Sequence, residues 1–238
     1  MPSKRWVITG ASRGIGLATA KKALSQGDHV AVLARRINLP ALRAELGPNA
    51  LMLATDVADP NSVQTSLGRI RETWGSIDVL VNNAGLHRGR KLARLDTADW
   101  DAVLATNLSG PMHCIKAALN LMGDGGAIVN IGAVVGFRGF PGDSPYGASK
   151  AGLAGLTQVL AVELAPRNIR VNLVVPGLVL SEMTSAVDEK AMSKLLERIP
   201  LGRIGRAEEI AAVICWVANS TYMTGAVIPT DGGLMAQF

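Results

Sequence analysis

A tyrosine and a lysine lie four residues apart in the segment "SPYGASK", as Tyr146 and Lys150. Asp143 or Ser144 can cap a helix whose first position is Pro145, so both side chains are expected on one helical face. A free phenol has a pKa of about 10, and an adjacent ammonium favours the phenolate. Such a tyrosine can protonate a carbonyl oxygen while hydride arrives at the carbon. A tyrosine and a lysine at this spacing are common, so the elements around the pair decide whether it has a catalytic role.

Apolar runs rich in valine, isoleucine and leucine recur along the chain and alternate with segments of helical period. Continuous rather than alternating hydrophobicity is expected of strands that helices cover on both faces. The pattern predicts one α/β domain over residues 1–238, a Rossmann-like, doubly wound parallel seven-stranded sheet with right-handed crossovers. The predicted strands are residues 6–9, 29–34, 51–57, 77–83, 127–132, 169–177 and 226–233.

The segment "TGASRGIG" follows the first predicted strand and opens a helix. Glycine there permits a tight turn and lets backbone N–H groups approach a pyrophosphate, which the helix N-terminus also favours. The flanking strand and helix favour a dinucleotide site over an ordinary glycine turn. The loop residues expected at the cofactor are Gly10, Ser12, Arg13, Gly14, Ile15 and Gly16.

The second predicted strand ends in Ala34, Arg35 and Arg36, where an NAD site usually has an acidic residue for the ribose hydroxyls. Together with Arg13, these arginines offer guanidinium groups to a 2'-phosphate. The sequence therefore predicts NADP(H) in preference to NAD(H). The alternative is that these are merely exposed arginines.

Composition sets the wider limits. The chain is 48% hydrophobic and 18% charged, which is typical of a globular protein, and its net charge of +5 would attract polyanions. Neither a signal peptide nor a membrane span is expected, and Cys114 and Cys215 are interpreted as small hydrophobic residues, so the expected location is the cytoplasm. The histidines show no ligand spacing, and no metal is expected. Three classes remain: a carbonyl reductase, a non-catalytic nucleotide-binding scaffold and a nucleic-acid binder.

Taken in order, the motifs resemble the short-chain dehydrogenase/reductase family over essentially the whole chain. Within that family the chain is most similar to 3-oxoacyl-[acyl-carrier-protein] reductases and acetoacetyl-CoA reductases, through "NIGAVVG" and "IPLGRIGRAEEIA". The motifs that carry the family resemblance are "TGASRGIG", "DV" at 56–57, "NNAG" at 82–85, Asn107, "YGASK", "PGLVLS" at 176–181 and "TGAVIPTDGG".

The resemblance implies a role for each matching residue. Tyr146 would be the general acid, and Lys150 would bind the nicotinamide ribose while lowering the pKa of the tyrosine. The other implied cofactor contacts are Asp56 and Val57 at the adenine, Asn83, Ala84 and Gly85 along the cofactor, and Pro176, Gly177, Val179 and Ser181 at the nicotinamide carboxamide.

Asn107 lies in a predicted helix from Thr97 to Met122 that also contains Gly110 and Pro111. Proline cannot donate to the carbonyl four residues back, which is that of Asn107, so the helix should kink there and leave that carbonyl free. In the family this position holds a water that links the lysine to solvent. An ordinary helix kink is the alternative.

The chain departs from the family at Ala133. The family's catalytic serine lies thirteen residues before the tyrosine, and that position is Ala133 here. Loss of one donor to a developing oxyanion typically costs about 10² to 10³ in turnover. Three interpretations follow: a weak reductase, a cofactor-binding relative without turnover, or a serine-to-alanine variant made to trap a complex. We favour reduction of a 3-oxoacyl thioester at a reduced rate.

Substrate and partners are indicated only in outline. Residues 181–200 have the pattern of an amphipathic flap over the site, and ordinary helix packing would explain them equally well. The basic run at 87–94 is a solvated loop or a docking site for a phosphate-bearing carrier. Arg167 fits a family position that docks acidic acyl carrier protein, while Asp124 does not fit a second, so a CoA thioester, another ketone or an alcohol remains open. Small residues after Tyr146 and the resemblance predict a homotetramer.

Overall fold

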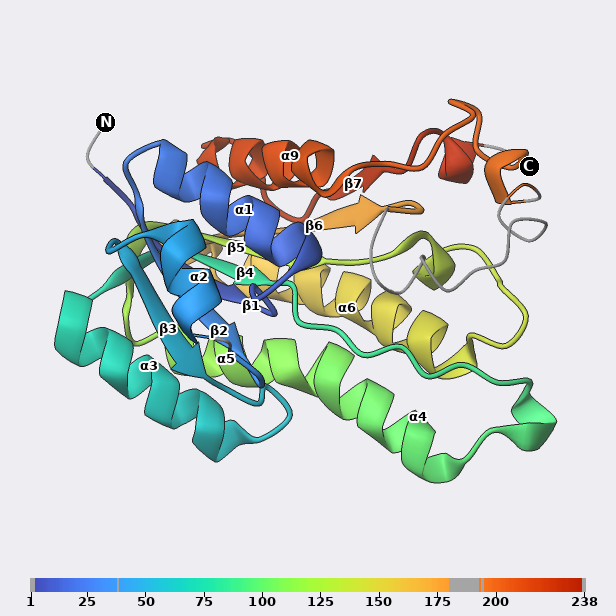
Figure 1. Ribbon diagram of the computed structural model, residues 1–238, viewed down its shortest axis with the longest axis horizontal. Coiled ribbons are helices and arrows are strands. Elements are labelled where there is room, and N and C mark those ends of the chain that lie inside the picture. The colour runs from blue at the N-terminus through green and yellow to red at the C-terminus, as the bar shows by residue number, and fades with distance from the viewer. Residues whose placement is uncertain (1–2, 38, 180–192, 194, 237–238) are drawn as a thin grey trace.

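The computed structural model describes residues 3–37, 39–179, 193 and 195–236. Its core is a seven-stranded parallel sheet in the order β3-β2-β1-β4-β5-β6-β7, which confirms the predicted fold class (Figure 1). The valine- and isoleucine-rich runs form the strands, and those in the middle of the sheet are buried on both faces. The strands are β1 Arg5–Thr9, β2 His29–Ala34, β3 Ala50–Ala54, β4 Ile77–Asn82, β5 Met122–Ile131, β6 Arg170–Pro176 and β7 Val227–Thr230.

Helices cover both faces of the sheet. Helices α1 and α9 pack together on one face, while α3, α5, α4 and α6 lie on the other (Figure 1). Each layer buries its own apolar cluster against the strands. The helices are α1 Gly14–Ser25, α2 Leu39–Leu46, α3 Pro60–Trp74, α4 Thr97–Leu104, α5 Gly110–Ala118, α6 Ser144–Glu163 and α9 Ala207–Asn219. In the described part of the chain, no helix combines the length and apolar character that crossing a membrane requires.

The region from Thr97 to Met122 differs from the prediction of one kinked helix. Helix α4 passes through a π-helical turn, Ala105–Ser109, into α5, which ends at Ala118, and Met122 already belongs to β5. The disturbance predicted at Pro111 is therefore a widened turn just before the proline, a form that often occurs at functional sites.

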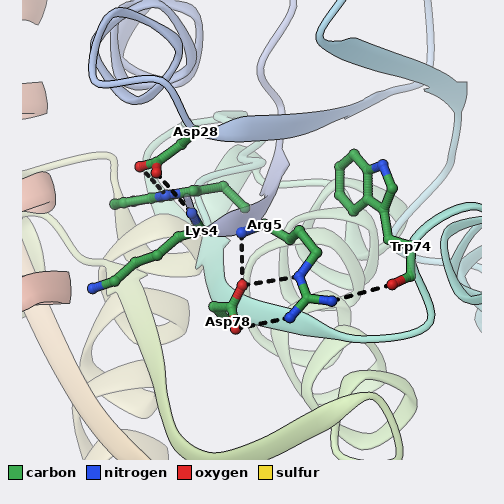
Figure 2. Close-up of polar contacts among 6 residues, drawn as sticks. Lys4, Arg5, Asp28, Trp74 and Asp78 are labelled. Carbon is green, nitrogen blue, oxygen red and sulfur yellow. Dashed lines mark hydrogen bonds and ion pairs between the residues drawn. The ribbon is translucent and has the colours of Figure 1, made fainter. Parts of the chain in front are cut away.

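Polar side chains tie the strands together at the amino-terminal edge of the sheet (Figure 2). The Asp28 carboxylate accepts from the backbone N–H of Lys4 and the indole N–H of Trp6, both at 2.8 Å. Arg5 donates through Nε to Asp78 at 3.0 Å and through Nη1 to the carbonyl of Trp74 at 3.1 Å. These bonds join β1 to β2 and β4, and the loops that carry the predicted site lie at the opposite edge.

Candidate active site

The carboxyl ends of the central strands β1, β4, β5 and β6 meet at one edge of the sheet. Chain order reverses between β1 and β4, and in parallel α/β sheets such a switch point is where ligands bind. The predicted glycine loop follows β1, "NNAG" spans the end of β4, and Ala133 follows β5. Sheet topology therefore brings together motifs that are far apart in the sequence.

The glycine loop is packed too closely for side chains. A Cβ atom on Gly16 would lie 2.5 Å from Nδ2 of Asn83, and one on Gly10 would lie 2.7 Å from Cα of Ala84. Gly10 and Gly14 also adopt positive φ angles of 65° and 57°. The loop thus presents bare backbone at the N-terminus of α1, where it can accept a pyrophosphate. The predicted loop residues fit a dinucleotide.

Hydrogen bonds hold this loop to the end of β4. The Thr9 hydroxyl accepts from the backbone N–H groups of Asn83 and Ala84, both at 3.0 Å. The Asn83 side chain donates to the carbonyls of Thr9 and Gly10 at 3.0 and 3.1 Å. Asn83 therefore holds the loop in shape, and the cofactor contact that the resemblance implies for Asn83 stays a prediction.

The residues predicted at the adenosine end follow β2 and β3. Arg35 and Arg36 are exposed just beyond β2. Asp56 accepts from the backbone N–H of Ala58 at 3.0 Å, and Val57 is buried. Two guanidinium groups beside this end of the sheet can bind a phosphate on the adenosine ribose.

Tyr146 and Lys150 lie on the first turns of α6, as predicted. The Lys150 Nζ donates to the carbonyl of Ile131, the last residue of β5, at 2.7 Å, and lies 5.6 Å from the centroid of the Tyr146 ring. Burial lowers the pKa of Lys150 to about 8. Burial and then the charge of Asp143 raise the pKa of Tyr146 to about 12. The direction differs from the lowered tyrosine pKa expected from the resemblance, because desolvation disfavours both charged forms.

Ala133 lies between Ile131, whose carbonyl accepts from Lys150, and Gly136 in the chain. It precedes the short 3₁₀ segment Val134–Gly136, and a Cβ on Gly136 would lie 2.9 Å from the backbone carbon of Lys150. The 3₁₀ segment after β5 therefore rests directly on the turn of α6 that carries Lys150. The segment brings to this place the methyl group of Ala133 and no hydroxyl.

Asn107 is fully buried in the π-helical turn, and its side chain is occupied by neighbouring backbone. Its Oδ1 accepts from the N–H of Leu86 at 2.7 Å, and its Nδ2 donates to the carbonyl of Leu86 at 2.9 Å and to the Ser149 hydroxyl at 3.2 Å. Ser149 in turn donates to the carbonyl of Tyr146 at 2.7 Å. Asn107 thus joins the segment after β4 to the helix that carries the tyrosine.

Sequence reasoning missed a contact between His87 and this site. His87 Nε2 lies 2.9 Å from Oδ1 of Asp143, and the rings of His87 and Tyr146 meet edge to face with centroids 5.1 Å apart. His87 and Asp143 are 56 residues apart, and no motif links them. The histidine was interpreted only as part of a basic loop.

Only some of the remaining predicted site residues lie within the part of the chain that the structure describes. Pro176 ends β6, the N–H of Gly177 donates to the carbonyl of Thr230 at 3.1 Å, and Val179 pairs with Gly205. Ser181 and most of the predicted flap lie outside the described residues. Arg167 donates to the carbonyls of Leu119 and Met122 at the amino-terminal edge of the sheet. Within one chain it is thus separated from Tyr146 by the length of α6.

The sequence matches the family model described as enoyl-(acyl carrier protein) reductase over residues 10–235. It is 43% identical to carbonyl reductase family member 4 of Danio rerio over 98% of both chains. It is 42% identical to the 3-oxoacyl-[acyl-carrier-protein] reductase of Thermotoga maritima over 99% of both chains.

Solved structures agree with these relatives. A mutant short-chain dehydrogenase/reductase from Serratia marcescens superposes with a TM-score of 0.93 at 34% identity, over 98% of both chains. A blue fluorescent protein from a metagenomic library, in complex with NADPH, superposes with a TM-score of 0.92 at 34% identity, over 97% of both chains.

Proposed function

The chain belongs to the short-chain dehydrogenase/reductase family, and from that premise we propose that it reduces the 3-oxo group of an acyl thioester with NADPH. The observation that carries the proposal is the placement of the Tyr146 phenol and Lys150 at the same sheet edge as the glycine loop. Relatives named 3-oxoacyl-[acyl-carrier-protein] reductase and carbonyl reductase support a carbonyl substrate. We also propose that residues 1–238 form one cofactor-binding domain; the substrate flap predicted at 181–200 stays a prediction, because most of these residues lie outside the described ones.

In this proposal the glycine loop would hold the dinucleotide, which would supply the hydride for the carbonyl carbon. Tyr146, whose pKa is raised to about 12, keeps its proton at neutral pH and offers it to the carbonyl oxygen. Lys150 carries the positive charge that favours the phenolate left behind. Asn107 holds Leu86 and, through Ser149, the backbone of Tyr146.

We assign NADP(H) rather than NAD(H) to the cofactor site. The exposed Arg35 and Arg36 follow β2, where an acidic residue would favour NAD. Arg13 occupies the N-cap position of α1, in the glycine loop that follows β1. The similar solved structure in complex with NADPH supports the assignment.

We expect turnover to be reduced by the methyl group at Ala133. The carbonyl oxygen becomes an oxyanion in the transition state, and one missing donor costs about 10² to 10³ in rate. The same observation favours a second function, in which the chain binds the dinucleotide without turnover. Cofactor affinity is unaffected in either case, because Ala133 lies after β5 and the glycine loop follows β1.

A second copy of the chain is the proposed partner. Helix α6 presents a stripe of small and apolar residues to solvent, and Val159 and Val162 are 63% and 77% exposed. Ala148, Ala151 and Gly155 continue the stripe at helical spacing. The stripe supports packing of α6 against α6 of another subunit within a homotetramer. An acidic acyl carrier protein and coenzyme A are the two proposed carriers of the substrate.

The test follows NADPH oxidation with acetoacetyl-CoA in the chain with Ala133 and in Ala133→Ser at equal concentration. We expect slow turnover with Ala133 and a gain of about 10² in Ala133→Ser. NADH in a parallel assay should support less turnover in both. Tight NADPH binding without oxidation in either protein would point to the binding function, and absence of NADPH binding would refute both.

A further inference from the structure

His87, Asp143 and Tyr146 form a contiguous cluster at the start of α6. His87 lies in the segment after β4, Asp143 precedes the first residue of α6, and Tyr146 is on its first turn. The Asp143 carboxylate makes no capping bond to the helix, and Oδ1 lies 2.9 Å from Nε2 of His87. His87 then meets the Tyr146 ring edge to face at 5.1 Å.

The close approach of the two loops is built into the backbone. A Cβ on Gly89 would lie 2.7 Å from Oδ1 of Asp143 and 2.9 Å from the carbonyl oxygen of Gly142. Any larger residue at 89 would separate the His87 loop from the start of α6. Glycine therefore permits the histidine to reach both the carboxylate and the phenol ring.

The restraint on His87 extends to the residue before it. Asn107 binds both the N–H and the carbonyl of Leu86, so the backbone that enters His87 is fixed by a buried side chain. Asp143 fixes the other end of the imidazole. His87 is thus restrained through the backbone that precedes it and through the Nε2 atom of its ring.

The position of Tyr146 depends on such a restraint, because its hydroxyl is not held by a hydrogen bond in the described part of the chain. Its hydroxyl makes no hydrogen bond within residues 3–37, 39–179, 193 and 195–236. In the family the hydroxyl at the position of Ala133 would share the substrate oxygen with the phenol, and that second contact is missing here. Correct placement of the proton donor then depends on the packing of the tyrosine ring.

We propose that His87, tethered by Asp143, is a positioning residue that fixes the Tyr146 ring for proton transfer in a site without a serine hydroxyl. The inference rests on the proposed reductase function. An edge-to-face aromatic contact supplies the directional preference, and small misplacements of a reacting group reduce rates steeply. The charge of Asp143 adds a second effect, because it raises the pKa of Tyr146 and keeps the phenol protonated.

Two substitutions separate the parts of this contact. His87→Gln keeps a donor that can reach Asp143 and removes the ring, whereas His87→Phe keeps a ring and removes the tether. His29→Gln is the matched control, since His29 also lies near an aromatic ring, with its centroid 6.3 Å from that of Trp74. His29 begins β2, at the amino-terminal edge of the sheet.

Kinetics of acetoacetyl-CoA reduction are measured in the Ala133→Ser background as well as in the chain with Ala133. We expect His87→Gln to lower kcat about tenfold without weakening NADPH binding, and His87→Phe to recover much of that loss. The loss should be larger with Ala133 than with serine. Unchanged kcat in His87→Gln, or a lower kcat in His87→Phe than in His87→Gln, would overturn the positioning role.

A second readout does not depend on turnover. The chain has two tyrosines, Tyr146 and the exposed Tyr222, so Tyr222→Phe leaves Tyr146 as the single tyrosine. Nuclear magnetic resonance of isotope-labelled tyrosine should show one narrow set of ring signals, which shifts or broadens in His87→Gln and not in His29→Gln. If no protein turns over, the proposed function fails, and these spectra still decide the inference: an unchanged Tyr146 signal rejects it.

Discussion

At the scale of single residues, burial acts in opposite directions on the two central groups. It raises the pKa of Tyr146 to about 12 and lowers the pKa of Lys150 to about 8. Both shifts favour the neutral form, because desolvation disfavours charge of either sign. At neutral pH the phenol therefore keeps its proton, as a reductase requires of its acid.

These shifts predict a stability profile for the cofactor-free chain. From about pH 8 to 10 unfolded Lys150 binds more protons than folded Lys150, so the free energy of unfolding should rise. From pH 10.5 to about 12 folded Tyr146 binds more protons than unfolded Tyr146, so the free energy of unfolding should fall. Urea unfolding across this range measures both limbs. Lys150→Met should lose the rise and Tyr146→Phe the fall, and a rise that survives in Lys150→Met would contradict the assignment.

At this scale the sequence predicted which residues form the site better than it predicted their surroundings. Tyr146, Lys150 and Ala133 could be identified by spacing, and the structure brings Tyr146 and Lys150 together. The pKa of Tyr146 and the contact with His87 could not be read, because both depend on how two distant loops pack.

At the scale of elements, close packing explains the glycines of the first loop. Gly16 faces Asn83 and the carbonyl of Gly10, whereas Gly68 in α3 faces open space. Sequence patterns found this loop and all seven strands, since continuous apolar runs mark buried parallel strands. They missed the π-helical turn and the early start of β5, because "MGDGG" reads as a turn and no residue type signals a widened helix.

The contrast between these two glycines can be tested by substitution. We expect Gly16→Ala to destabilise the fold by about 1–3 kcal/mol through overpacking and to weaken NADPH binding. Gly68→Ala should stabilise by about 1 kcal/mol, because alanine is the better helix former and its methyl group meets nothing. Urea unfolding and NADPH titration measure both. Equal effects of the two substitutions on stability would show that the glycine loop can accommodate an added methyl group.

At the scale of the whole molecule, the exposed apolar stripe on α6 is the surface that we propose to contact a second copy of the chain. Exposed apolar patches on a helix that is otherwise well packed typically mark interfaces. The sequence indicated this through small residues after Tyr146, while the exposure of Val159 and Val162 required the fold.

We expect light scattering to give a mass near four times that of the 24.9 kDa chain. Val162→Glu should lower this mass, because a charge would be buried at the contact. Gln64→Glu on the exposed face of α3 serves as a control and should leave the mass unchanged. A monomeric mass for the unsubstituted chain would refute the assembly, and a tetramer that tolerates Val162→Glu would place its contacts elsewhere.

The Thr9 hydroxyl has a consequence for how such a site can be re-engineered. It binds the amides of Asn83 and Ala84, while Asn83 binds the carbonyls of Thr9 and Gly10. The loop after β1 and the segment after β4 are therefore one interlocked module. A loop grafted from another protein to change cofactor preference would arrive without its counterpart unless position 83 were transferred with it, and the disturbance would reach the strand end from which Leu86 and His87 extend.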